Sequence, residues 1–266
     1  MTKRKWLLVA LVLFGVTLLL TLERERIFPA QDRSWQTIQE RGVWRVGLDP
    51  SFPPFESLDA NGNPIGYDVD LAQEIAAAWG VQAEIVTIGF DSLLDALQAG
   101  QIDSVVSALP YDQRLTKDVA YSMPYFEAGI RLVVRTDSTL SSVEQLTNQK
   151  VAVEWGSMGD MIGRRLQREQ AALQLAPYST PQEAVEALIN DQTIDALLVD
   201  QVTVRTAQGN GAPIQAVGPA LESNPYVIAM PHAAVTLQEK VASTLRTLQE
   251  TGVMTKIESQ WFDHSK

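Results

Sequence analysis

The stretch 45–56, RVGLDPSFPPFE, has the residue types of a ligand-binding loop. An apolar strand runs into three prolines and two phenylalanines, so the backbone is stiff and Phe52 and Phe55 can be displayed at little entropic cost. Apolar rings on a rigid loop at the carboxyl end of a strand are suitable walls for a small-molecule site. Either ring can instead fill the core; for Phe52 both interpretations stand, and for Phe55 we expect the core.

A second candidate feature is the Ser-x-x-Asp pattern from Ser157 to Asp160, which predicts a helix N-terminus. The free backbone N–H groups at such an end can bind an anion. Motifs for other chemistry are missing from the sequence: a Gly-rich phosphate loop, a nucleophile elbow, a zinc-protease helix and a carboxylate-rich calcium loop. Acidic residues are plentiful, but their spacing does not identify a catalytic pair.

The composition narrows the class of protein further. The 266 residues include no cysteine, which excludes disulfides, Cys-ligated metals and thiol catalysis, and His232 and His264 cannot make a typical zinc site by themselves. We therefore expect no metal and no cofactor. The formal charge of −11 argues against a nucleic-acid partner, and the length suits one or two domains.

The N-terminus has the pattern of an export signal. Lys3–Lys5 precede the uncharged, apolar run Trp6–Leu22, which predicts that the rest of the chain lies outside the cytoplasm. Residues 1–30 are then a cleaved signal peptide or a retained anchor. We favour the uncleaved anchor, because the run lacks an Ala-x-Ala site and no cysteine can carry a lipid. Residues 1–30 hold five basic and two acidic residues, so the exported part carries −14.

The elements that must position these residues form two similar sets. Residues 31–42 are expected to be a linker with a short helical piece. The pattern then predicts strands over 43–48, 83–87, 102–107, 151–153 and 194–199, and helices that start at Asp68, Asp91, Ser141, Ser157, Thr180 and Thr236. Segments 96–103 and 187–195, about 90 residues apart, both read as a helix, a polar turn and Ile-Asp entering a strand. This echo indicates two α/β lobes with a ligand crevice at the strand ends between them, unless the similarity is chance.

Seven motifs in order carry a resemblance to a known family. They are RVGLDPSFPPFE (45–56), IGYDVDLAQEIA (65–76), IDSVVSALPYDQR (102–114), VAYSMPYF (119–126), KVAVEWGSMGD (150–160), IDALLVD (194–200) and LQETGVMTKIESQWF (248–262). Over roughly residues 40–262 the chain resembles the bacterial extracellular solute-binding proteins that serve polar-amino-acid ABC transporters.

The resemblance implies the fold class and the division into domains. It implies an α/β, two-lobed type II periplasmic-binding-protein fold with a ligand cleft between the lobes, preceded here by the N-terminal apolar helix. Lobe 1 is expected to be discontinuous, over 43–130 and 225–266, and lobe 2 is expected over 131–224.

The resemblance also implies the site residues. Arg114 stands at the family's carboxylate-binding arginine in lobe 1, and Asp200 stands at its ammonium-binding aspartate in lobe 2. A bidentate guanidinium suits a buried carboxylate, and a carboxylate suits an ammonium group. Asp49 resembles the position near the ligand side chain, Phe52 and Phe90 resemble aromatic walls, and Ser107, Ser157 and Met158 complete the predicted ligand-binding set.

Plainer interpretations of these residues remain open. Arg114 can be a surface ion-pair residue, Asp200 a loop residue, and Asp49 the cap of a turn before Pro50. The sequence also departs from the family, which usually has a Ser or Thr hydroxyl a few residues before the arginine. Here that stretch is 109–113, one residue short, and Pro110 has no N–H to donate. Ser107, Tyr111 or water then replaces the donor, or the ligand is not a plain α-amino acid.

We therefore expect a non-enzymatic extracytoplasmic receptor, in the periplasm or at the cell surface. It would bind an amino acid, polar or cationic in view of Asp49, Glu154 and Asp200, and deliver it to an ABC permease as a monomer tethered to the membrane. Two alternatives stay open: an exported dehydratase of the same fold, for which Glu154 or Asp49 would be the general acid, and a ligand sensor that acts with a separate signalling protein.

Overall fold

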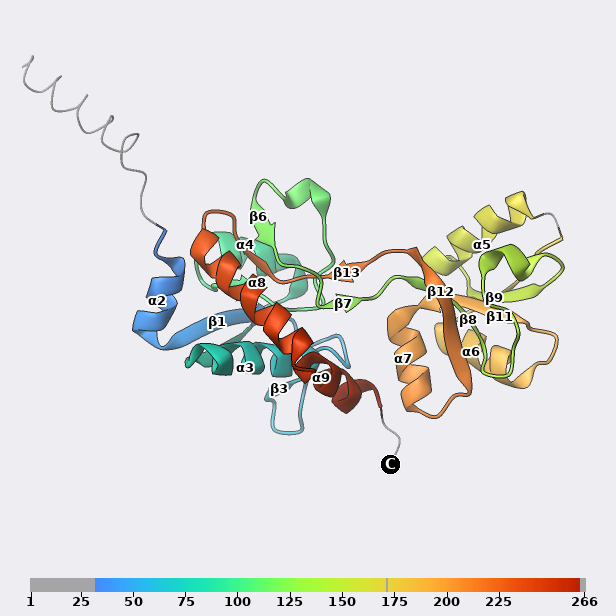
Figure 1. The fold of residues 1–266 in the computed structure, drawn as a ribbon, viewed down its shortest axis with the longest axis horizontal. Coiled ribbons are helices and arrows are strands. Elements are labelled where there is room, and N and C mark those ends of the chain that lie inside the picture. The colour runs from blue at the N-terminus through green and yellow to red at the C-terminus, as the bar shows by residue number, and fades with distance from the viewer. Residues whose placement is uncertain (1–31, 171, 264–266) are drawn as a thin grey trace, which may run out of the picture.

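The chain forms two lobes joined by two extended segments (Figure 1). The computed structural model describes residues 32–170 and 172–263, so the predicted anchor over 1–30 lies outside the described residues. Within that described part, no helix is both long and apolar enough to cross a membrane. Each lobe is built around one five-stranded sheet with helices on both of its faces.

The sheet of lobe 1 has the strand order β4-β1-β5-β14-β6. The first three strands run parallel to one another, and β14 runs antiparallel to both of its neighbours, β5 and β6. Their bounds are β1 Val43–Leu48, β4 Gln82–Thr87, β5 Ser104–Val105, β6 Val119–Tyr121 and β14 Ala229–Pro231, with a small hairpin of β2 Ser57–Leu58 and β3 Pro64–Ile65 beside them. The strand predicted over 102–107 is therefore limited to two residues, and the residues after it turn away into a loop.

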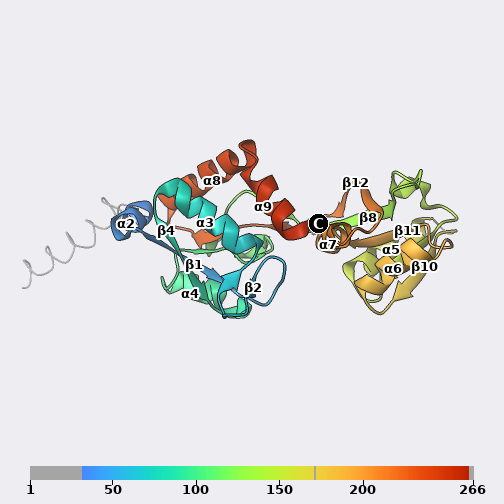
Figure 2. The same ribbon diagram turned by 90° about the horizontal axis from the view of Figure 1, so that it is seen from below.

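Helices cover both faces of this sheet. Figure 2 shows α3, α8 and α9 on one side and α4 on the other. The bounds are α2 Ser34–Arg41, α3 Tyr67–Trp79, α4 Leu93–Gln98, α8 Val235–Glu250 and α9 Val253–Phe262. The predicted inward face of the C-terminal helix is confirmed, because Leu237, Val241, Leu245 and Leu248 of α8 are all buried. Where a linker with a short helical piece was expected over 31–42, α2 packs Ile38 into the core of this lobe.

The helix predicted to start at Asp91 begins as a 3₁₀ turn over Phe90–Ser92 and continues as α4 from Leu93. Two other predicted capping residues of lobe 1 bind distant partners instead. Asp68 was expected to cap α3, but the N-cap is Gly66, and Asp68 is fully buried with its carboxylate accepting the Ala108 N–H. Thr236 was expected to cap α8, but the helix begins at Val235, and the Thr236 hydroxyl donates to Asp32 instead. In both cases a partner from a distant part of the chain competes with the local capping role.

The sheet of lobe 2 has the order β10-β9-β11-β8-β12, with β10, β9 and β11 parallel and the other two antiparallel. Its strands are β8 Ile130–Arg135, β9 Lys150–Glu154, β10 Gln174–Tyr178, β11 Ala196–Asp200 and β12 Ile214–Glu222, and its helices are α5 Met158–Glu169, α6 Pro181–Asn190 and α7 Gln201–Gly209. The predicted caps Ser157 and Thr180 are confirmed. The cap expected at Ser141 forms one residue later, at Ser142 with Gln145.

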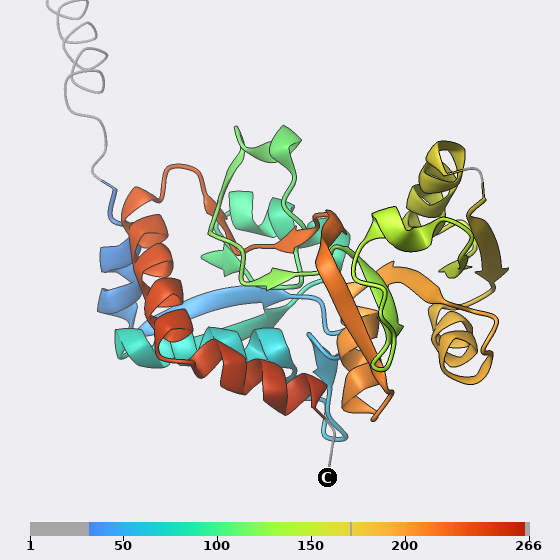
Figure 3. The same ribbon diagram turned by 45° about the vertical axis from the view of Figure 1, so that its right-hand side comes forward.

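The chain crosses between the lobes along two paired strands. Along the chain, β7 (Phe126–Glu127) leads out of lobe 1 and β13 (Pro225–Tyr226) leads back into it, and the two strands pair antiparallel. Figure 3 shows the green and the orange-red segments passing between the lobes together. The Glu127 carboxylate ties them, because it accepts the backbone N–H of Gly129 at 2.8 Å, the backbone N–H of Asn224 at 2.7 Å and the Ser223 hydroxyl at 2.6 Å.

The lobes also meet beside this crossover. The Arg205 guanidinium of α7 pairs with Glu258 of α9 at 3.0 Å and with Asp263 at 3.4 Å, and it lies 6.0 Å from the centre of the Phe262 ring. Ionic and cation–π contacts therefore supplement the two-stranded connection in this arrangement of the lobes.

The crossover predicts the cost of a substitution at Gly129. A Cβ there would lie 2.1 Å from the backbone oxygen of Glu222, so Gly129→Ala must displace the end of β12, from which the chain leads into the return crossing. We expect a loss of about 2–4 kcal/mol in the free energy of unfolding. Gly89→Ala is the matched control, because no atom lies within 4 Å of a Cβ at that position. Urea unfolding measures both variants, and equal stabilities would contradict the tight crossover.

Candidate functional site

A cavity of about 300 Å³ lies in lobe 1 where β1 and β5 end. Because these parallel strands finish at the same edge of the sheet, the loops that follow them converge there. The cavity is lined by Asp49, Ser51, Phe52, Glu56, Phe90, Ser107, Ala108, Pro110 and Tyr226. Four of the predicted site residues, Asp49, Phe52, Phe90 and Ser107, are therefore brought together by three separate loops.

Two exposed aromatic rings form walls of this cavity. Phe52 is 44% exposed and Phe90 is 43% exposed, whereas Phe55 is fully buried. Phe55 packs its ring parallel to that of Phe52 at 5.8 Å and lies edge-on to Phe126 and Tyr226. The prediction that Phe55 belongs to the core is confirmed, and the buried ring supports Phe52 from behind.

Hydrogen bonds fix the polar side of the cavity. The Asp49 N–H donates to Ser107 Oγ at 3.0 Å, and Asp49 Oδ2 accepts the Phe90 N–H at 2.8 Å. The Ser107 hydroxyl donates in turn to Glu56 Oε1 at 2.9 Å. Ser107 was expected to offer the ligand its hydroxyl or its main chain, and in the structure the hydroxyl is fully buried and already engaged on both sides.

Two buried carboxyl groups lie behind this wall. Burial, followed by the nearby charge of Asp68, raises the pKa of Glu56 to about 11. Burial also raises the pKa of Asp68 to about 6, although the Ala108 N–H donates to its Oδ2 at 2.5 Å. Glu56 reaches the cavity and was not selected from the sequence; its place directly after the buried Phe55 in a stiff loop was the available signal.

Arg114 lies outside the residues that line the cavity. It sits in the short 3₁₀ helix η2 (Gln113–Leu115), its side chain is 88% exposed, and it pairs with Asp112 at 2.6 Å. The hydrogen bonds from Arg114 hold the pKa of Asp112 down, at about 2. The plainer interpretation, a surface ion pair, therefore describes the contacts of Arg114 in this arrangement of the lobes.

Pro110 lines the cavity without an N–H to donate, as the sequence indicated. Its backbone forms an isolated antiparallel β-bridge with Tyr226. Tyr226 lies on the segment that returns from lobe 2, and it was not predicted as a site residue. Only the pairing of the returning segment places Tyr226 here, so no local motif could have identified it.

The other predicted residues lie at the strand ends of lobe 2. Asp200 ends β11 and caps α7, where Oδ1 accepts the Thr203 N–H at 2.8 Å and Oδ2 accepts the Thr203 hydroxyl at 2.7 Å. Each carboxylate oxygen has a second lone pair, so both can accept a further donor. Ser157 follows β9 and caps α5, and Met158, the first residue of α5, is 45% exposed.

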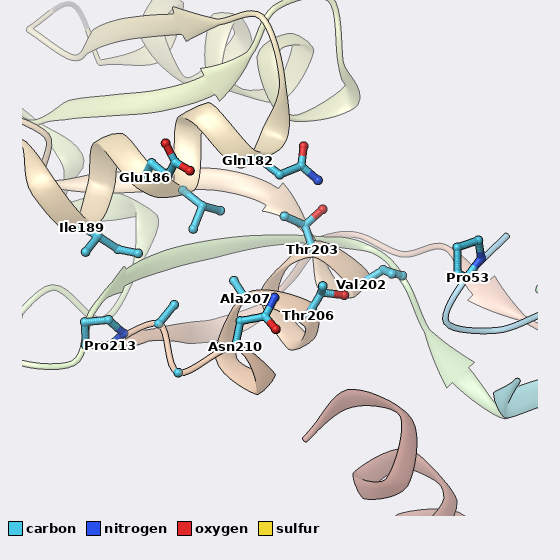
Figure 4. A pocket seen from close by; sticks show the side chains of 13 residues that line it. Pro53, Gln182, Glu186, Ile189, Val202, Thr203, Thr206, Ala207, Asn210 and Pro213 are labelled. Carbon is cyan, nitrogen blue, oxygen red and sulfur yellow. The ribbon is translucent and has the colours of Figure 1, made fainter. Parts of the chain in front are cut away.

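A larger cavity, about 570 Å³, lies between α6 and α7 of lobe 2. Figure 4 shows Gln182 and Glu186 on α6, Val202, Thr203 and Thr206 on α7, and Pro53 of lobe 1 at one side. Thr203, the hydrogen-bond partner of Asp200, lines it, so the cavity lies beside the lobe 2 strand ends. Of the predicted site residues, four line the smaller cavity in lobe 1 and three lie at the lobe 2 strand ends, whereas Arg114 lies at neither place.

No metal centre is built by the side chains of residues 32–170 and 172–263. Within these ranges, no three His, Asp or Glu residues gather in a way that would hold an ion. What the arrangement offers is aromatic walls, carboxylate acceptors and the N-terminus of α5, which suit an organic ligand with charged ends.

Comparison with known proteins identifies similar chains. The model of the bacterial extracellular solute-binding proteins, family 3, matches residues 44–264. The putative ABC transporter arginine-binding protein 2 of Escherichia coli K12 is 27% identical over 82% of this chain and 90% of its own. The L-cystine-binding protein TcyJ of the same strain is 24% identical over 85% of this chain and 84% of its own.

A solved structure shares the fold. The crystal structure of an ancestral cyclohexadienyl dehydratase has a TM-score of 0.73 and 23% identity, and the match covers 89% of this chain and 99% of that one. At this identity the match shows the architecture alone. The chain therefore shares its fold with an enzyme and is similar in sequence to two binding proteins.

The capping role of Asp200 yields a test of local stability. Asp200→Ala removes both acceptors from Thr203, and we expect it to lower the free energy of unfolding by about 1 kcal/mol. Asp200→Asn keeps an oxygen at the N-cap and should lie within a few tenths of a kcal/mol of the wild type. Urea unfolding distinguishes the two, and equal losses would show that the cap contributes nothing.

Proposed function

The chain belongs to the bacterial extracellular solute-binding proteins, family 3, and on this premise we propose that it binds an amino acid outside the cytoplasm and delivers it to the permease of an ABC transporter. Its two lobes have the type II solute-binding architecture that the sequence predicted. The observation that carries the proposal is the lobe 1 cavity, where Phe52, Phe90 and Asp49 surround a space suited to a small polar molecule with an apolar stem.

The proposed binding mode uses both lobes. The two rings would enclose the aliphatic part of the ligand, Asp200 would accept its ammonium group, and the N-terminus of α5 would receive its carboxylate. A ligand that contacts both lobes stabilises their closed arrangement, which is the form that a permease can distinguish.

Arg114 has a specific part in this proposal. Its guanidinium would exchange Asp112 for the ligand carboxylate, a replacement of one ionic partner by another. Because Arg114 is exposed on its own lobe, we expect the exchange to depend on closure of the lobes.

The proposed ligand is polar or cationic. Asp49, Glu154 and Asp200 supply negative charge near the strand ends of both lobes, and one relative is named for arginine. Another relative is named for L-cystine, so a binding experiment has to identify which amino acid this chain binds. Isothermal titration against the amino-acid panel tests the proposal, and no binding by any amino acid at millimolar concentration would overturn it. Conversion of prephenate or arogenate would instead support the dehydratase.

We propose in addition that residues 1–30 tether a monomeric receptor to the cell membrane. The basic residues Lys3–Lys5 and the apolar run Trp6–Leu22 support this. Fractionation of cells that express the full chain tests it, because a released receptor would leave the membrane fraction.

Arg114→Ala tests the carboxylate partner. We expect its affinity for the amino acid found in the panel to fall by about 100-fold, because the carboxylate loses a charged hydrogen-bond partner. Arg246→Ala, at an exposed position of α8, makes the same change of charge and should bind as the wild type does. Titration calorimetry measures both, and unchanged binding by Arg114→Ala would assign the carboxylate to other groups.

A further inference from the structure

Two carboxyl groups with no cationic partner lie behind the lobe 1 cavity. Glu56 is 1% exposed and Asp68 is 0% exposed. Throughout the described ranges, none of the ion pairs involves either residue. The other groups that face them are acidic or neutral: Asp49, Ser107 and the hydroxyls of Tyr67, Tyr125 and Tyr226. Two negative charges in this setting would be strongly unfavourable.

The hydrogen bonds account for only half of the carboxyl oxygens. Glu56 Oε1 accepts from Ser107, and Asp68 Oδ2 accepts from the Ala108 N–H. Glu56 Oε2, Asp68 Oδ1 and the Tyr125 hydroxyl are buried, and none of the three has a geometrically formed hydrogen bond among the described residues. The two carboxyl groups are interacting neighbours, and the Tyr125 hydroxyl is a further neighbour of Asp68. A proton held between the two acids would give Glu56 a partner that no other neighbouring group supplies.

We propose that Glu56 and Asp68 share a single proton, with Glu56 as the neutral member, and that the pair acts as a positioning unit for the lobe 1 half of the ligand site. That this cavity holds a ligand rests on the proposed function. The structural content, a protonated acid that orders the cavity wall, does not depend on it.

The positioning follows a continuous set of contacts. Neutral Glu56 presents Oε1 to the Ser107 hydroxyl, Ser107 holds the Asp49 N–H, and Asp49 holds the N–H of the wall residue Phe90. Ionised Asp68 accepts the N–H of Ala108, which lines the cavity with φ of 41°, a left-handed conformation that is unfavourable for a residue other than glycine. The pair thus fixes the ends of the loops that form the polar wall.

The direction of the pH dependence follows from the proton count. Burial, followed by Asp68, raises the pKa of Glu56 from 4.5 to about 11, so above about pH 6 the folded chain holds a proton that the unfolded chain has released. Stability contributed by this group therefore falls as the pH rises. Gln at position 56 carries no titrating proton, and its amide can donate to Asp68 in place of the acid.

The first experiment compares Glu56→Gln with the wild type in urea unfolding between about pH 6 and about pH 9. The folded-to-unfolded ratio of the wild type should fall, relative to the variant, by up to about tenfold per pH unit. Glu74→Gln, at an exposed glutamate of α3, is the matched control and should run parallel to the wild type. Parallel pH profiles for wild type and Glu56→Gln would overturn the shared proton.

Two further measurements keep the proposal testable without a ligand. The wild type at neutral pH should show the infrared C=O stretch of a protonated carboxylic acid, and its absence would overturn the proposal even if no variant folds. Amide hydrogen exchange at Asp49 and Phe90 should be at least about tenfold faster in Glu56→Ala and unchanged in Glu56→Gln. Unchanged exchange in Glu56→Ala would remove the positioning role. None of these results depends on whether an amino acid binds.

Discussion

The antiparallel pairing of β7 with β13 is the constraint on which the remaining structure depends. The chain leaves lobe 1 and re-enters it at one place, so the last 40 or so residues must complete the lobe that the first part began. That return supplies β14 to the lobe 1 sheet, Tyr226 to the cavity and the buried face of α8 to the core. Glu127 and the absence of a Cβ at Gly129 let the two segments approach each other closely.

The parallel strands of each sheet determine where the candidate site residues converge. β1 and β5 in lobe 1, and β9 and β11 in lobe 2, end at the edges from which Asp49, Ser107, Ser157 and Asp200 emerge. At the lobe 1 edge the fold must also accommodate two buried acids, because the loop that carries Phe52 also buries Glu56 against Asp68. The same acids that keep the wall in place are the ones whose burial is least favourable in isolation, and hydrogen bonds with Ser107 and Ala108 compensate part of that cost.

Prediction from the sequence succeeded where the signal was local and periodic. The buried face of α8, the caps at Ser157 and Thr180, and the buried Phe55 follow from spacing, from capping chemistry and from a stiff apolar loop. It failed at Asp68 and Thr236, where a capping pattern was present but a distant partner took the side chain. Tyr226 was missed because it is part of no local motif and reaches the cavity only through the returning segment. Glu56 lies in the 45–56 motif, but its burial against Asp68 depends on long-range packing.

The sequence by itself determined the family, the two α/β lobes and the candidate set from Asp49 to Asp200, because hydrophobic periodicity and ordered motifs are properties of short segments. Only the tertiary structure decided which of those residues share one cavity, that Ser107 is engaged on both sides, and that Arg114 pairs with Asp112 outside the lining. The physical reason is burial. A carboxyl group or hydroxyl has one set of properties in water and another when distant segments close around it, and no local pattern encodes that closure.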